Sequence, residues 1–147
     1  MTMMPKSKRN IRMAQLFTKK VMAIELALLL SSQVVVASER EMTQEYLSCL
    51  ERANGVTAEM MNCILAETIR QDTRLNENYK RLISKLSTER KNGLVEAERA
   101  WMRFRDTNCG FYADPEGGSA ARLAAGECIL NATADRAKEL QLLNKDQ

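Results

Sequence analysis

Apolar residues recur at helical spacing along most of the chain after residue 56. Between residues 57 and 86 they advance in alternating steps of four and three, which keeps them on one face of a helix. Six members of this stripe are apolar: Met61, Leu65, Leu75, Tyr79, Leu82 and Leu86. Thr68 and Asp72 fill the two remaining places. The pattern predicts a long helix that Thr57 caps, and no strand pattern competes with it.

A short helix is expected before the long one. Residues 38–41 (SERE) have the form of a capping box, in which a serine and a glutamate three residues later satisfy backbone donors at a helix start. The turn signal Asn54-Gly55 is expected to end this helix.

Two more helices are expected in the C-terminal half. The third begins within residues 87–93 (STERKNG), either at a cap on Thr88 or after an Asn92-Gly93 turn, and runs to about Tyr112. Its apolar face consists of Leu94, Ala97, Trp101 and Phe104. Ser119 is expected to cap the fourth helix. The stripe of that helix is Leu123, Leu130, Ala134, Ala137 and Leu140. The sequence therefore predicts an all-α fold, a small bundle of about four helices.

The four cysteines are placed symmetrically about turn signals. Cys49 and Cys63 each lie seven residues from Val56, and Cys109 and Cys128 flank Gly118-Ser119 at equal distances. Residues equidistant from the turn of an antiparallel hairpin become neighbours, so the spacing favours the pairs Cys49–Cys63 and Cys109–Cys128. A zinc site is disfavoured because no two cysteines are separated by only two residues. We expect two disulfide-stapled helical hairpins.

The composition excludes several classes of chemistry. The chain of 147 residues contains no histidine, which rules out Ser-His-Asp and Cys-His nucleophiles and histidine-ligated metals. No paired acids of the glycosidase kind and no redox Cys-x-x-Cys motif are present. We therefore expect a binding protein rather than an enzyme, with no cofactor and no metal.

The first 37 residues have the form of a secretory signal. They hold six Lys and Arg and one acid. The basic residues precede a largely apolar run at 21–37, which ends in small residues before Ser38. This run of 17 residues contains Glu25, and a membrane-spanning helix needs roughly 20 apolar residues. The chain starts at Met1 or, if the long basic region is not translated, at Met13.

Cleavage after residue 37 changes the charge of the protein. It leaves one domain over residues 38–147 with 16 basic and 18 acidic residues, a net charge of −2. We therefore predict a periplasmic or secreted protein that has no membrane anchor after cleavage and does not bind nucleic acid. The oligomeric state is left open.

Several polar side chains interrupt the apolar stripes. Asp72 lies at a stripe position, and two further residues follow it within two helical turns. A similar group of three surrounds Trp101 on the third helix. The six residues are Asp72, Asn76, Tyr79, Trp101, Arg105 and Asp106. We expect a half-buried polar network that fixes helix register, in which Asp72 accepts a hydrogen bond from Arg105 or the Trp101 indole. The alternative is a recognition surface.

The segment at 113–119 (ADPEGGS) is the second candidate for binding. It connects two helices, and its functional interpretation is an exposed acidic loop that enters a partner's cleft. Rigid presentation by the Cys109–Cys128 disulfide would lower the ordering cost of binding. The candidate contact residues are Asp114, Glu116, Gly117, Gly118 and Ser119.

A combination of these residues resembles the LprI-like family of bacterial exported proteins, over roughly residues 46–142. It comprises Cys63, Asp72-x-x-Leu75-Asn76-x-x-Tyr79, Leu94-x-x-Ala97-x-x-Ala100, Trp101-x-x-Phe104-Arg105-Asp106-x-x-Cys109, Gly117-Gly118-Ser119, Cys128 and Arg136-x-x-Glu139-Leu140. The resemblance implies a secreted, disulfide-stapled helical domain that inhibits lysozyme. Unlike the family's type member, this chain has no lipid-attachment motif.

Three functions are open at this stage. The first is an exported inhibitor of lysozyme or a related cell-wall lytic enzyme. The second is an immunity-type protein against a periplasmic toxin. The third is a structural or adaptor protein of the bacterial envelope, which would bind envelope proteins rather than a lytic enzyme.

Overall fold

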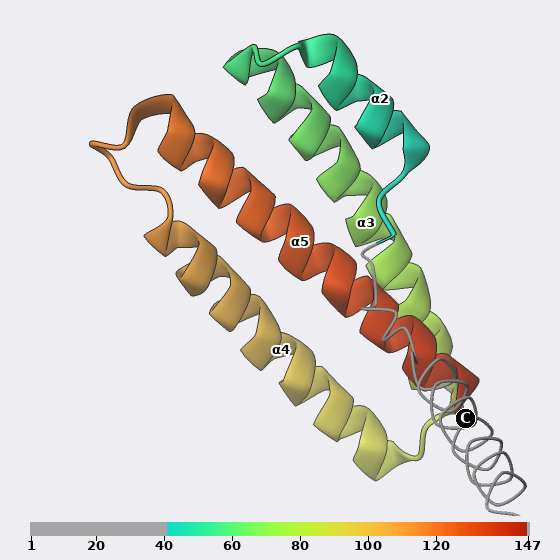
Figure 1. Ribbon diagram of the computed structural model, residues 1–147. Helices are drawn as coiled ribbons and strands as arrows, with labels where there is room; N and C mark the ends of the chain where they lie inside the picture. The colour runs from blue at the N-terminus through green and yellow to red at the C-terminus, as the bar shows by residue number, and fades with distance from the viewer. Residues whose placement is uncertain (1–40, 147) are drawn as a thin grey trace, which may run out of the picture. The chain divides into compact units, whose positions relative to one another are not determined.

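The computed structural model of the protein describes residues 41–146. The predicted signal peptide, its cleavage point and the start of the capping box at Ser38 lie outside these residues. Four helices and no strand occur in the described part of the chain (Figure 1). They are α2 (Gln44–Ala53), α3 (Thr57–Lys85), α4 (Thr88–Phe111) and α5 (Gly118–Lys145). The predicted all-α fold of about four helices is confirmed.

Helix α5 is the central element of this bundle. It packs along α3, its most extensive partner, and on its other side it contacts α4, while α2 lies against α3 (Figure 1). Helices α3 and α5 run in the same direction: Ile64 lies beside Gly126, and near the other end Lys85 Nζ donates to the carbonyl of Asn144 at 3.0 Å. Helix α4 is the antiparallel connection between them.

Two disulfides close the two hairpins as expected. Cys49 of α2 is bonded to Cys63 of α3 with a Cα–Cα distance of 5.7 Å, and Cys109 of α4 to Cys128 of α5 with 5.4 Å. Asn54 and Gly55 form the first turn, both with positive φ. The predicted pairing is confirmed, and it explains why the cysteine positions are symmetric about the turns.

The helix starts differ by a few residues from the expected caps. Helix α2 begins after Thr43, whose side chain accepts from the backbone N–H of Tyr46, and Glu41 is not helical. Helix α4 is capped by Ser87 in the same way, so the expected cap on Thr88 is wrong by one residue. The alternative start after an Asn92-Gly93 turn is wrong because both residues are helical.

Two other expected caps, Thr57 and Ser119, are wrong. Val56 is the N-cap residue of α3 and Gly117 that of α5, and neither supplies a side-chain hydrogen bond to the helix start. Thr57 and Ser119 instead lie inside the first turns of these helices.

The stripe predicted for α3 is correct in its second half and only partly correct in its first, where Met61 packs against the core. Leu75, Leu82 and Leu86 are buried, with Ala137 and Leu140 of α5. Leu65 is 59% exposed, and the adjacent Ile64 is buried in its place. Toward the chain before α2, this part of α3 presents Glu67 and Gln71, buried polar side chains that an apolar stripe does not include.

Helix α4 buries little of the face predicted for it. Leu94 and Trp101 pack against the core, but Ala97 is exposed and Phe104 is 64% exposed. The reason is that α4 packs mainly on one neighbour, α5. The stripe on α5 is confirmed, with Leu130, Ala134, Ala137 and Leu140 buried and Leu123 packed against the core near the first disulfide.

Candidate functional site

A groove between α3 and α4 contains most of the polar residues predicted to cluster. Five of them line a cavity of about 340 Å³: Asp72, Asn76, Tyr79, Trp101 and Arg105. Leu75, Val95 and Met102 supply its apolar walls. The structure therefore brings these residues together around one hollow, while Asp106 lies outside its lining.

The hydrogen bonds of these residues are not the expected ones. Asp72 is exposed rather than inward-facing, and its carboxylate accepts from the Asn76 side chain one turn later at 2.9 Å. Arg105 stacks over the Trp101 ring at 5.0 Å from its centroid and pairs with Asp106 at 2.8 Å. The expected bond from Arg105 or Trp101 to Asp72 is therefore wrong, and the cluster consists of separate local pairs.

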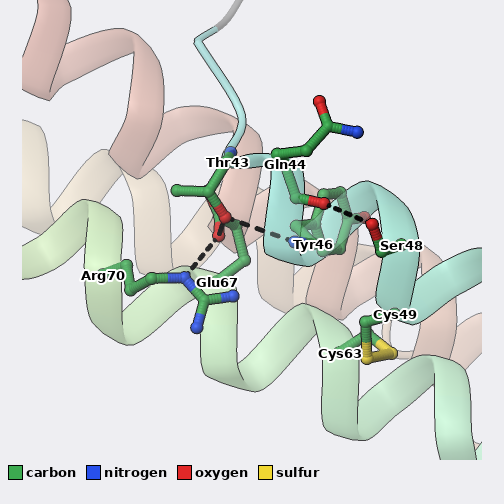
Figure 2. The surroundings of a disulfide bond; sticks show 8 residues. All are labelled: Thr43, Gln44, Tyr46, Ser48, Cys49, Cys63, Glu67 and Arg70. Carbon is green, nitrogen blue, oxygen red and sulfur yellow. Dashed lines mark hydrogen bonds and ion pairs between the residues drawn. A yellow bond between two sulfur atoms is a disulfide. The ribbon is translucent and has the colours of Figure 1, made fainter.

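A buried polar network does exist, and sequence reasoning missed it. It is centred on Glu67, whose side chain is fully buried and accepts from the N–H and hydroxyl of Thr43 at 2.9 and 2.6 Å (Figure 2). Gln71 and Arg70 donate to the same carboxylate at 2.8 and 2.7 Å. Burial alone raises the pKa of Glu67, but these hydrogen bonds outweigh it and hold the pKa below its ordinary value. The network ties the start of α2 to α3.

A second missed pair joins α4 to α5. Arg136 donates to Glu98 from two nitrogens, at 3.0 and 2.6 Å, and to Glu139 at 2.6 Å. Burial lowers the pKa of Arg136, but the hydrogen bonds with Glu98 and Glu139 prevail and raise it. The available signal was position: Glu98 follows Leu94 by four residues and precedes Trp101 by three, so it shares their inner face.

The loop at 113–119 is exposed along its whole length. The Asp114 carboxylate accepts from the backbone N–H of Glu116 at 2.9 Å, which gives the loop a local turn. Gly118 adopts a φ of +61°, a conformation that favours glycine. The Cys109–Cys128 bond lies at the base of the loop, so the acidic side chains are displayed on a closed segment.

Two aromatic residues that the sequence reasoning did not single out precede this loop. Phe111 is 84% exposed and Tyr112 is 47% exposed, and their rings meet edge-on at 5.8 Å between centroids. Large exposed aromatic side chains are enriched at protein interfaces. The only sequence signal for them was their place at the end of a helix beside a loop.

No group of three or more metal-ligating side chains occurs in residues 41–146. None of the helices within this range is long and apolar enough to cross a membrane.

Comparison with known proteins identifies a family. Searches among curated proteins and among solved structures give no match. A family model described as lysozyme inhibitor LprI matches residues 49–140, more than half of the chain. The matched segment runs from Cys49 in α2 to Leu140 in α5 and includes both disulfides and the groove between α3 and α4. The chain belongs to the lysozyme inhibitor LprI family.

Proposed function

We propose that this protein is an exported inhibitor of a cell-wall lytic enzyme, with lysozyme as its first candidate target. The observation that carries the proposal is the family match over residues 49–140. In this proposal the protein acts by binding and has no catalytic residue, cofactor or metal of its own. The target that it inhibits is a protein, and neither a nucleic acid nor a membrane takes part in the inhibition.

The proposed location is the periplasm or the extracellular space. Two disulfides fit an oxidising compartment, because thiols of cytosolic proteins are kept reduced. The basic and apolar segment at 1–37 fits a signal peptide that is removed, leaving residues 38–147 as the mature domain.

The contact surface that we favour is the loop with its neighbouring aromatic pair, here called the loop surface: Phe111, Tyr112, Asp114 and Glu116. It combines two exposed aromatic rings with two exposed carboxylates. Animal-type lysozymes are strongly cationic, so the carboxylates complement their charge and the rings supply apolar area to bury. The loop is held by a disulfide and a local hydrogen bond, which reduces the entropy lost on binding.

The test is a lytic assay with the disulfide-bonded protein. Animal-type lysozyme acts on bacterial cell walls while the protein is titrated in, and size-exclusion chromatography follows complex formation. Loss of lysis near stoichiometric ratio, with a matching complex, supports the proposal. Full lysis at large excess contradicts it, and pull-down of envelope proteins would then favour the adaptor function.

A further inference from the structure

A basic cavity lies near the C-terminal ends of α3 and α5, at the other end of α5 from the loop surface. Its volume is about 410 Å³, within the range of small-ligand pockets. Four cationic side chains line it: Arg74, Arg81, Lys85 and Lys145. No carboxylate is part of the lining. This concentration of positive charge contrasts with the net charge of −2 over residues 38–147.

The remaining lining consists of the amide side chains of Asn78, Gln141 and Asn144, and the two asparagines are anchored to backbone carbonyls. Asn78 is buried and donates to the carbonyl of Ala137 at 2.9 Å, and Asn144 donates to the carbonyl of Asn78 at 2.8 Å. Arg81 in turn donates to the Asn78 side chain at 3.0 Å. The wall is therefore cross-linked between α3 and α5, and the cations are arranged on a fixed frame.

Helix dipoles explain only part of this arrangement. The C-terminal end of a helix carries partial negative charge that favours cations in the last turn, which accounts for Lys85 and Lys145. Arg74 lies about three turns before the end of α3, beyond the reach of that effect.

The neighbouring acids compensate for only some of the positive charge. Arg74 pairs with Glu41, and Arg81 lies 3.8 Å from Glu77. Both carboxylates are more than half exposed, so water weakens these pairs. Positive charge therefore remains within the cavity.

We propose that this cavity binds a phosphate-bearing anion. A phosphate group offers several acceptor oxygens and a double negative charge, which matches two guanidinium groups that donate in pairs and two ammonium groups that act as point charges. A neutral sugar would not compensate the positive charge that the neighbouring acids leave. The phosphate can belong to a free small molecule or to a lipid headgroup, because the chemistry that the cavity recognises is the same.

The proposal is tested by calorimetry on the disulfide-bonded protein, with inorganic phosphate and pyrophosphate as probes. The variant Arg81→Gln with Lys145→Gln removes two lining cations. The control variant Arg103→Gln with Arg122→Gln removes two exposed cations outside the cavity. We expect one pyrophosphate per chain, bound roughly tenfold more weakly by the cavity variant. The affinity of the control should match that of the wild type.

Vesicles distinguish the two sources of phosphate. Binding to phosphatidylglycerol vesicles but not to phosphatidylcholine vesicles, lost in the cavity variant, identifies a headgroup, whereas binding of pyrophosphate alone identifies a free ligand. Phosphate also stabilises proteins nonspecifically. A thermal result supports the proposal when added phosphate raises the melting temperature of the wild type more than that of the cavity variant, at equal ionic strength. The proposal is overturned if inorganic phosphate, pyrophosphate and phosphatidylglycerol vesicles all fail to bind. It is also overturned if the control variant binds pyrophosphate as weakly as the cavity variant does.

Discussion

At the scale of single residues, Glu67 is the carboxylate on which local structure depends most. It is fully buried, yet it accepts four hydrogen bonds, from Thr43, Arg70 and Gln71. Figure 2 shows Thr43 and Arg70 beside it. A buried carboxylate is tolerated only when such partners replace the water that it has lost. Because Thr43 is also the N-cap residue of α2, one side chain both caps that helix and docks it on α3.

The variant Glu67→Gln should destabilise the fold. The single side-chain oxygen of glutamine cannot accept all four hydrogen bonds, and its NH2 group would face other donors. We therefore expect the free energy of unfolding to fall by about 1–3 kcal/mol. Urea denaturation followed by circular dichroism measures this. The control Glu77→Gln replaces an exposed carboxylate whose ion pair spans 3.8 Å, and it should stay within about 0.5 kcal/mol of wild type. Equal effects of the two changes would contradict the role assigned to Glu67.

The same carboxylate should make stability depend on pH. Its pKa is lower in the folded protein than its ordinary value of 4.5, so its ionised form favours folding. This contribution is fully present above pH 4.5 and is lost as the pH falls through the folded-state pKa. The stability gap between wild type and Glu67→Gln should therefore narrow on acidification below about pH 4, in urea titrations at successive pH values. A constant gap would contradict the assignment.

The two loop acids are expected to act on the partner rather than on the fold. Asp114→Ala with Glu116→Ala should leave the melting temperature nearly unchanged, since both side chains are exposed. If the loop surface contacts lysozyme, the inhibition constant should rise by roughly tenfold. The matched control is Glu77→Ala with Glu89→Ala, which removes the same charge from exposed helix positions. An inhibition constant unchanged in the loop variant would exclude the loop as the contact.

At the scale of elements, α4 is the least secured helix. Its only buried residues are Glu98 and Cys109, and its main packing partner is α5. What holds it at the loop end is the Cys109–Cys128 bond, and in its middle the pair of Glu98 with Arg136. Helix α2 is much shorter, but it adds Tyr46 and Ala53 to the core around the first disulfide.

Removing the second disulfide should therefore loosen α4 selectively. Cys109→Ser with Cys128→Ser is expected to cost about 3 kcal/mol, as is Cys49→Ser with Cys63→Ser, because the closed loops are of similar length. Hydrogen exchange separates the two variants. Only the variant that lacks Cys109 and Cys128 should show amide exchange in α4 well before α3 and α5. Uniform exchange across all helices would mean that α4 is not an independent unit.

These elements show what the sequence determines locally. The helices and both disulfides could be predicted because stripes, turn signals and symmetric cysteines are short-range patterns. The burial of Glu67 could not, because it depends on Thr43, which is 24 residues away and docks only in the folded chain. The sequence placed Asp72 and Trp101 in one cluster, and both line the groove. The hydrogen bond expected between them could not be predicted correctly, because α4 packs on α5 and leaves the groove open.

At the scale of the whole domain, charge is distributed unevenly along α5. The acidic loop precedes its first turn, and the basic cavity lies at its last turns. With 28 residues, α5 separates the two ends by about 42 Å. That distance exceeds the Debye length of about 8 Å at physiological salt but is comparable to the roughly 30 Å at low salt.

This separation makes a prediction about association with a cationic lysozyme. At low ionic strength the basic cavity repels the approaching enzyme, so Arg81→Gln with Lys145→Gln should accelerate association at the loop surface. At physiological salt the same variant should associate at the wild-type rate, because the repulsion is screened over the length of α5. Stopped-flow measurements at both salt concentrations provide the test. Acceleration that persists at physiological salt would place the contact near the basic cavity and not at the loop.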